Sequence, residues 1–184
     1  MRNPLSDFWE SYLRWRHFKG YGVHSPFAYR LVTEVINPGD YGYYGYVGIH
    51  RACNKINGDE ARMRLLLRLM VQLQKRRIVL NRQPDDVYRA VAKSVSASCI
   101  GLKGTGIFKF QPGDLLVIER EVSGETINEA IEKETPVIAY DPAPVLRKIM
   151  ETPINRGLLL QGKKTIILIP RKEMAYTSYI MKMP

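Results

Sequence analysis

The sequence predicts an α/β protein with a mostly parallel, Rossmann-like sheet, an antiparallel hairpin at the C-terminal end and a helical extension at the N-terminus. Three observations lead to this fold class. From residue 77 onward, short β-rich runs alternate with helical stretches, which is typical of parallel strands joined by crossover helices. Several of these runs are apolar at successive positions, as expected of strands covered on both faces. The last three runs follow one another too closely for crossover helices and should pair antiparallel.

Two helices are expected near the N-terminus. Residues 5–19 have the periodicity of a short amphipathic helix. Its aromatic side should dock on the rest of the protein, opposite Arg14 and His17, and consists of Phe8, Trp9, Tyr12 and Leu13. A second helix is expected to start at Ser25 and Pro26, because a serine hydroxyl caps free N–H groups and a proline at the first position has no N–H to leave unpaired.

A tract rich in glycine and tyrosine, residues 39–48, follows the second helix. Its many helix breakers predict a surface loop rather than a helix or a regular strand. The strongest helical periodicity in the chain comes next, over residues 57–74. Leucines and methionines lie on one side of this predicted helix and Arg64 and Arg68 on another.

We expect residues 1–58 to form the helical extension and the Tyr/Gly loop, and residues 59–184 to form the sheet domain, in one compact unit. Strands are predicted at 77–81, 97–101, 114–119, 136–140, 157–161, 165–170 and 176–183. Helices are predicted near 84–95, 124–134 and 143–151.

The chain is strongly basic, and the excess of positive charge lies in its N-terminal half. Its 184 residues include 28 Lys and Arg against 18 Asp and Glu, which gives a net charge of +10. Residues 1–82 hold 14 of the basic side chains and 6 of the acidic ones. Arg62, Arg64, Arg68 and the tyrosines of residues 39–48 could contact the phosphates and unpaired bases of a nucleic acid. The other interpretation is a solvated helix face beside a packed loop.

The composition argues against several classes of protein. A hydrophobic content of 45% with 25% charged residues is ordinary for a globular domain and excludes a disordered tail or a fibre. The two cysteines form no CxxC motif and the three histidines lack metal-ligand spacing, so neither a disulfide scaffold nor a metal site is predicted. No apolar run approaches the roughly 18 residues of a membrane span, and the chain does not start like a secretion signal. We therefore expect a soluble, cytoplasmic protein without a membrane partner.

Several segments resemble one family of enzymes. Residues 22–27 read GVHSPF, and near the other end stand DLLVIE at 114–119, PVIAYDP at 136–142 and TIILIPRKEMAYTSYIM at 165–181. In these segments the chain resembles the class I S-adenosylmethionine-dependent methyltransferases, most closely a bacterial subgroup that opens with a short aromatic helix and a GVHSPF segment. The resemblance implies a Rossmann-like sheet that ends in an antiparallel hairpin strand. It also implies methyl transfer from S-adenosylmethionine to an oxygen or nitrogen nucleophile.

The resemblance indicates where the site residues should lie. Family members bind the cofactor at a turn after the first strand, where this chain has Asn81 and Arg82, so these two are the predicted cofactor-binding residues. Glu119 and Asp141 come at the carboxyl ends of later strands, where open α/β sheets bind ligands. They are the predicted catalytic residues, able to orient a nucleophile or accept its proton. The alternative for both carboxylates is that they cap helices or lie in solvent.

The chain departs from the family at the predicted cofactor turn. The family's turn is rich in glycine, whereas here Arg82, Gln83, Pro84, Asp85 and Asp86 follow the first strand. The family's acidic residue at the end of the second strand is also missing, because that strand ends in Gly101. We therefore predict a shortened methyltransferase-like protein with a degenerate cofactor site and weak or no catalysis, which would act on a small-molecule or anionic substrate. The alternative is a non-enzymatic binding module whose basic N-terminal half holds RNA, an acidic protein or another copy of the chain.

Overall fold

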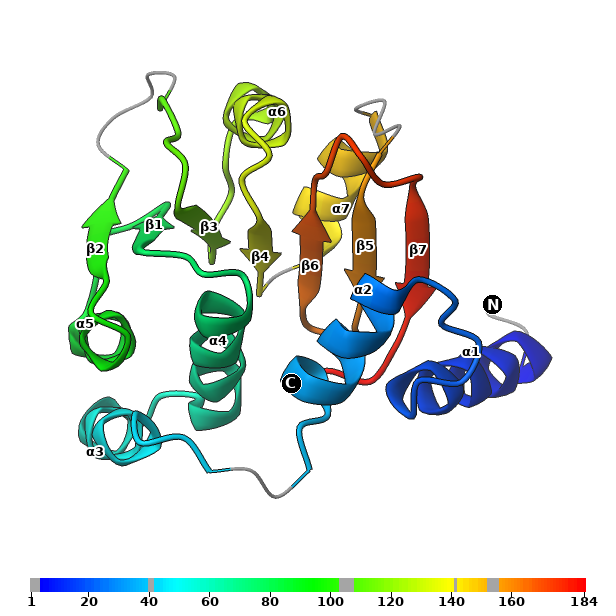
Figure 1. Cartoon of the computed structure of the whole chain (residues 1–184), viewed down its shortest axis with the longest axis horizontal. Helices are drawn as coiled ribbons and strands as arrows, with labels where there is room; N and C mark the ends of the chain where they lie inside the picture. Colours follow the sequence, from blue (N-terminus) through cyan, green and yellow to red (C-terminus); the bar gives the residue numbers. More distant parts are fainter. Residues whose placement is uncertain (1–3, 40–41, 103–107, 141, 152–155) are drawn as a thin grey trace.

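The computed structural model describes residues 4–39, 42–102, 108–140, 142–151 and 156–184. A seven-stranded sheet in the order β2-β1-β3-β4-β6-β5-β7 lies at its centre, and helices pack against both faces (Figure 1). The strands are β1 (Arg77–Leu80), β2 (Ser98–Gly101), β3 (Asp114–Ile118), β4 (Val137–Ala139), β5 (Leu158–Gln161), β6 (Ile166–Ile169) and β7 (Thr177–Ile180). The helices are α1 (Pro4–Phe18), α2 (Pro26–Arg30), the π-helix η1 (Leu31–Ile36), α3 (Tyr46–Ile56), α4 (Glu60–Gln72), α5 (Asp86–Ser94), α6 (Gly124–Glu132) and α7 (Pro142–Glu151). The predicted fold class is confirmed.

Strand β6 runs against the direction that the other six described strands share. It forms a hairpin with β5 on one side and pairs antiparallel with β4 on the other. Strand β7 pairs with β5 in parallel, so the prediction that the last three strands all pair antiparallel is wrong for β7. Both edges of β6 are already taken, and β7 therefore adds to the free edge of β5. No crossover helix is needed because β6 has reversed the chain in between.

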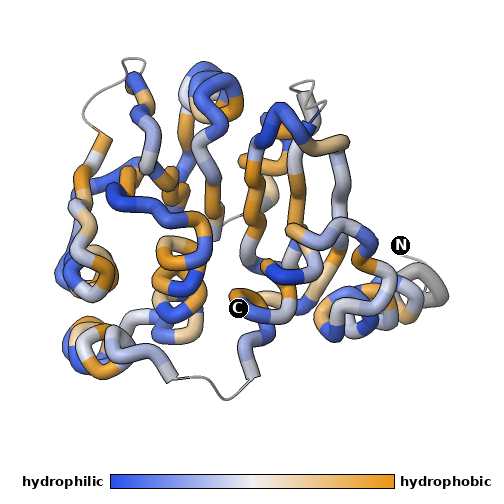
Figure 2. Tube along the Cα trace, in the orientation of Figure 1, coloured by the Kyte–Doolittle hydropathy of each residue, from blue (hydrophilic) through white to orange (hydrophobic). Residues whose placement is uncertain are grey.

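Side chains along most strands alternate between two hydrophobic clusters, one on each face of the sheet. In β1, for example, Ile78 and Leu80 belong to one cluster and Val79 to the other. The first cluster includes residues of α2, η1, α3, α4 and α5, and the second includes residues of α6 and α7. Figure 2 shows β4, β5 and β6 as largely hydrophobic along their length. A parallel sheet is stable only when both of its faces are covered, and here the helices before β1 cover much of one face.

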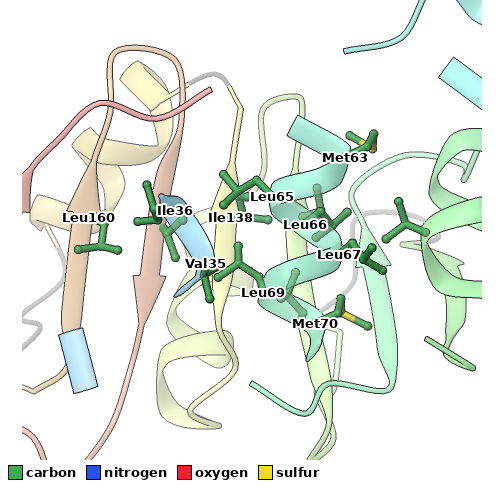
Figure 3. Packing of buried hydrophobic residues seen from close by; sticks show 14 of the residues in the cluster. Val35, Ile36, Met63, Leu65, Leu66, Leu67, Leu69, Met70, Ile138 and Leu160 are labelled. Atoms are coloured by element: carbon green, nitrogen blue, oxygen red, sulfur yellow. The ribbon is translucent and has the colours of Figure 1, made fainter. Parts of the chain in front are cut away.

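Helix α4 lies at the centre of the first cluster. It begins at Glu60, later than the predicted residue 57. Leu65 and Leu69 are almost completely buried, and Figure 3 shows them on the side of α4 that faces Val35 of η1. Burying a leucine side chain contributes about 2 kcal/mol, so this contact joins the N-terminal helices firmly to the sheet domain.

Helix α3 begins inside the tract predicted as a loop at residues 39–48 and replaces the last three residues of that prediction. It begins at Tyr46 and ends where Asn57 adopts a left-handed backbone conformation, with φ at 52°. Gly45 in this tract allows close packing, because a Cβ atom at this position would lie 2.7 Å from the Cβ of Ser94 on α5. The loop prediction is therefore wrong from residue 46 onward.

Helix α1 packs beside β7 through the side that was predicted to face solvent. The Arg14 guanidinium donates to the carbonyl of Met181 at 3.3 Å, and Nδ1 of His17 lies 2.8 Å from the carbonyl of Ile180. The aromatic side is exposed instead, with exposed fractions of 72% for Phe8, 59% for Trp9, 41% for Tyr12 and 54% for Trp15. The predicted docking face is thus wrong. Periodicity groups residues on one side of a helix, but here the polar side finds acceptors at the sheet edge.

An ion pair joins β1 to β3 at the amino ends of both strands. Arg77 and Asp114 stand at paired positions of the two strands. The guanidinium donates to both carboxylate oxygens, at 2.6 and 2.7 Å, and the backbone N–H of Gln111 donates to the same carboxylate at 2.8 Å. Asp114 is 2% exposed, so its charge is balanced almost entirely by Arg77.

The substitution Arg77→Met is expected to lower the free energy of unfolding by about 3 kcal/mol, because it leaves a buried carboxylate without its cation. Urea denaturation at neutral pH measures this change. The double variant Arg77→Met/Asp114→Leu removes both charges and is expected to recover most of the loss. A loss below about 1 kcal/mol in the single variant would contradict this account of the ion pair.

Candidate functional site

Three of the four predicted site residues lie together at the carboxyl ends of two neighbouring strands. Asn81 and Arg82 follow β1, Glu119 follows β3, and β1 pairs with β3 in parallel. The fourth, Asp141, lies outside the residues that the structure describes. Their predicted roles in binding and catalysis stay predictions, but the shared location at this edge of the sheet is observed.

The guanidinium of Arg82 is held between two carboxylates. Its Nε donates to Glu119 and its Nη2 donates to Asp85 at 2.6 Å. The second oxygen of Glu119 accepts a hydrogen bond at 2.6 Å from the hydroxyl of Tyr88, a side chain that is 1% exposed. The Arg82 guanidinium also lies 5.2 Å from the centre of the Tyr88 ring. Arg82 therefore neutralises the two carboxylates, and both oxygens of Glu119 accept hydrogen bonds from the protein itself.

The protonation of this cluster follows from its burial and its hydrogen bonds. Burial raises the pKa of Tyr88, and its hydrogen bond to Glu119 raises it further. Burial lowers the pKa of Arg82, but the hydrogen bonds to Asp85 and Glu119 outweigh burial and raise it above its ordinary value. Tyr88 thus remains a neutral donor, and Arg82 remains a cation at every accessible pH.

The side chain of Asn81 joins the ends of β1 and β3. Its amide oxygen accepts from the backbone N–H of Glu119 at 3.0 Å, and its Nδ2 donates to the carbonyl of Arg120 at 2.7 Å. Both halves of the amide are used by the protein backbone. In the conformation described, Asn81 fixes the turn after β3.

Asp85 caps the helix that follows β1. One carboxylate oxygen accepts from the backbone N–H groups of Val87 at 3.0 Å and Tyr88 at 3.1 Å. Burial raises the pKa of Asp85, but the hydrogen bonds from Arg82 and from the helix outweigh burial and hold the pKa below its usual value. The N–H groups at the start of α5, which could face a ligand, are therefore occupied by the chain itself.

Gly101 makes room for the turn after β1. A Cβ atom at this position would lie 2.7 Å from the carbonyl oxygen of Arg82 and 3.3 Å from the Cα of Gln83. The backbone of the turn thus lies against the end of β2, where the resemblance places an acidic residue.

Two further residues next to the cluster were not predicted from the sequence. Tyr140 follows β4, is 6% exposed, and donates to the carbonyl of Arg62 at 3.3 Å; burial raises the pKa of its hydroxyl. Burial likewise raises the pKa of the Cys99 thiol to about 12, so this cysteine is not a thiolate nucleophile at neutral pH. The sequence could have located Tyr140 only by its place at the end of a strand. Its burial depends on how α4 packs, which the sequence pattern does not show.

The arginines of α4 do not form the free cationic face that a nucleic acid would need. Arg62 pairs with Asp59 at 3.1 Å and Arg64 pairs with Glu60. Arg68 is 7% exposed and donates to the carbonyl of Val35 at 2.5 Å. The nucleic-acid contact predicted for these three arginines is therefore not supported by their positions.

The tyrosines of residues 39–48 are not a shared stacking surface either. The rings of Tyr43 and Tyr46 lie 5.4 Å apart and both pack against the core, whereas Tyr44 is fully exposed. Tyr41 lies outside the described residues. The single exposed ring of Tyr44 leaves little of the predicted aromatic platform.

No protein-family model and no curated protein matches this chain. Within the described ranges, no group of three or more His, Cys, Asp or Glu side chains is placed to hold a metal ion. No helix in the part of the chain that the structure describes combines the length and the apolar character needed to cross a membrane.

The substitution Asp85→Ala is expected to lower the free energy of unfolding by about 1 to 2 kcal/mol at pH 7, because α5 loses its cap and Arg82 loses a partner. Folding lowers the pKa of Asp85, so its stabilisation is complete above the unfolded-state pKa of about 4 and is lost as the pH falls through the folded-state pKa. Urea denaturation should therefore show the difference from wild type shrinking below about pH 4. The exposed neighbour Asp86→Ala is the matched control, and an equal loss in both variants would contradict the capping role.

The substitution Gly101→Ala is expected to destabilise the protein by about 2 kcal/mol, because the added methyl group meets backbone atoms of the turn after β1. Thermal unfolding followed by circular dichroism measures the change. Gly124→Ala serves as the control, since a Cβ atom there meets nothing within 4 Å. Unchanged stability in Gly101→Ala would show that the turn does not depend on this contact.

Proposed function

We propose that this chain is a class I methyltransferase-like protein whose cofactor crevice is filled by its own side chains, and that it acts as a binding protein rather than as a methyl-transfer enzyme. The observation that carries the proposal is the position of Arg82. Its guanidinium is held by Asp85 and Glu119 at the carboxyl end of β1, where open α/β sheets bind their ligands.

The architecture supports the first half of the proposal. A mostly parallel sheet whose C-terminal hairpin includes the antiparallel strand β6 is what the resemblance in residues 22–27, 114–119, 136–142 and 165–181 leads us to expect. The fold alone does not choose among activities, because Rossmann-like sheets carry many of them. The choice therefore depends on the residues at the crevice.

The residues at the crevice do not fit S-adenosylmethionine. The family's turn needs glycines so that the backbone can approach the ligand, and here that turn carries the ion-paired side chain of Arg82. The helix N-terminus behind it is already capped by Asp85. The end of β2 offers no carboxylate to a ribose, and Gly101 leaves no room for one. We therefore derive no methyl-transfer step for Glu119 or Asp141.

A binding role agrees with the net positive charge of the chain. The chain keeps its net charge of +10, and RNA, an acidic protein or a second copy of the chain are the partner classes that the sequence suggests. We further propose a cytoplasmic location, which the two unpaired cysteines Cys53 and Cys99 favour.

Isothermal titration of the full chain with S-adenosylmethionine and with S-adenosylhomocysteine tests the proposal. We expect no binding tighter than about 1 mM for either compound. A dissociation constant below about 100 µM that Asn81→Ala abolishes would overturn it, because the crevice would then hold the cofactor despite the Arg82 ion pairs. Asp86→Ala, at an exposed position on the neighbouring helix, is the control for nonspecific effects of substitution.

A further inference from the structure

Helix α1 presents a row of exposed aromatic rings. The rings of Trp9 and Tyr12 lie 5.6 Å apart and those of Tyr12 and Trp15 lie 6.4 Å apart, with similar tilts of 32° and 33°. Trp9 and Trp15 are the only two tryptophans of the chain, and both are more than half exposed. Large aromatic side chains are costly to leave in water, so a row of three on one helix face indicates a contact surface.

A groove lies between this helix and the turn of the β5–β6 hairpin. One part of it is a cavity of about 550 Å³ lined by Trp15, Met181 and Met183 and by the lysines Lys163, Lys164 and Lys182. A second cavity of about 680 Å³ shares Lys163 with the first and continues along α1 and α7. Figure 1 shows α1 at the β7 edge of the sheet.

The free charge of the groove is positive. Lys163, Lys164 and Lys182 are all exposed, and none forms an ion pair with a residue that the structure describes. The two acids of the groove are already neutralised, because Glu10 pairs with Arg14 and Asp59 pairs with Arg62. The lysines therefore remain available to an anionic ligand, unlike the arginines of α4.

We propose that this groove binds single-stranded nucleic acid, with one base stacked on Trp15 in its lining, further bases stacked on Tyr12 and Trp9 outside the lining on the exposed side of α1, and phosphates held by the lysines. Aromatic rings beside a line of cations are the combination that binds unpaired strands without reading their sequence. The lysines line a concave cavity, which a strand can enter and the flat surface of a bilayer cannot. The inference names a partner for the proposed binding role and rests on it, but it uses different residues from the crevice at β1.

Fluorescence anisotropy with labelled single-stranded RNA and DNA of about 12 nucleotides tests the inference on the full chain. We expect binding at low salt that weakens as salt rises, and quenching of the intrinsic tryptophan fluorescence over the same titration. The RNA and DNA arms identify which strand the groove prefers. A duplex of the same sequence should bind more weakly, because its bases are not free to stack.

Two sets of variants locate the site. Trp15→Ala is expected to weaken binding about 10-fold, the loss of one stacked base. Removing Lys163, Lys164 and Lys182 together by alanine substitution should reduce the slope of log affinity against log salt by about 2. The matched control replaces three exposed lysines elsewhere, Lys55, Lys93 and Lys133, and should leave both affinity and tryptophan quenching nearly unchanged. Circular dichroism and thermal unfolding confirm that each variant is folded.

Three outcomes would overturn the inference: no binding of either strand at about 50 mM salt, equal losses in the groove and control lysine variants, or tryptophan quenching by anionic phospholipid vesicles but not by oligonucleotides. The result is separable from the test of the crevice. If neither oligonucleotides nor the cofactor bind, this inference is wrong, but the proposed binding role stands with another partner. If both bind, only the proposal that the cofactor crevice is filled is wrong.

Discussion

The need to cover both faces of a mostly parallel sheet governs the rest of this structure. Helices α6 and α7 cover one face. The other face is covered by α5 and by helices that come before β1 in the chain. Residues before β1 are therefore part of the core, and the leucines of α4 lie among its most deeply buried side chains. The segment before β1, which includes the predicted extension and α4, therefore supplies much of the apolar cover on this face of the sheet.

Several arginines of the N-terminal half are paired inside the structure and are not free on its surface. Arg68 is buried against a main-chain carbonyl, while the partly buried Arg77 pairs with one aspartate and the partly buried Arg82 with two carboxylates. A planar guanidinium can satisfy several acceptors at once, which suits it to such positions better than an ammonium group. The composition therefore overstates the free positive charge near α4, and the lysines of the β5–β6 turn and the C-terminal segment carry more of it than the sequence suggests.

Much of the fold could be predicted, because short apolar runs with defined spacing limit the possible strand arrangements. The errors have specific causes. Phe8 and Trp9 share a helix side in the sequence whether that side is buried or exposed, and Gly45 looks like a helix breaker although it permits close packing. At the site, the parallel pairing of β1 and β3 brings Asn81 and Glu119 together, and both were located in the sequence as residues at strand ends. Their hydrogen-bond partners depend on the exact path of the turn, which spacing does not encode.

The position of α1 has a consequence for solubility. Strand β7 is the last strand of the sheet, and a long unpaired edge is a template for pairing with another chain. His17 occupies the carbonyl of Ile180 on that strand, so the helix covers part of the exposed backbone with its polar side. A chain without α1 would present β7 uncovered and would be prone to edge-to-edge aggregation. The polar side of α1 thus shields the sheet edge, while its aromatic side stays exposed to solvent.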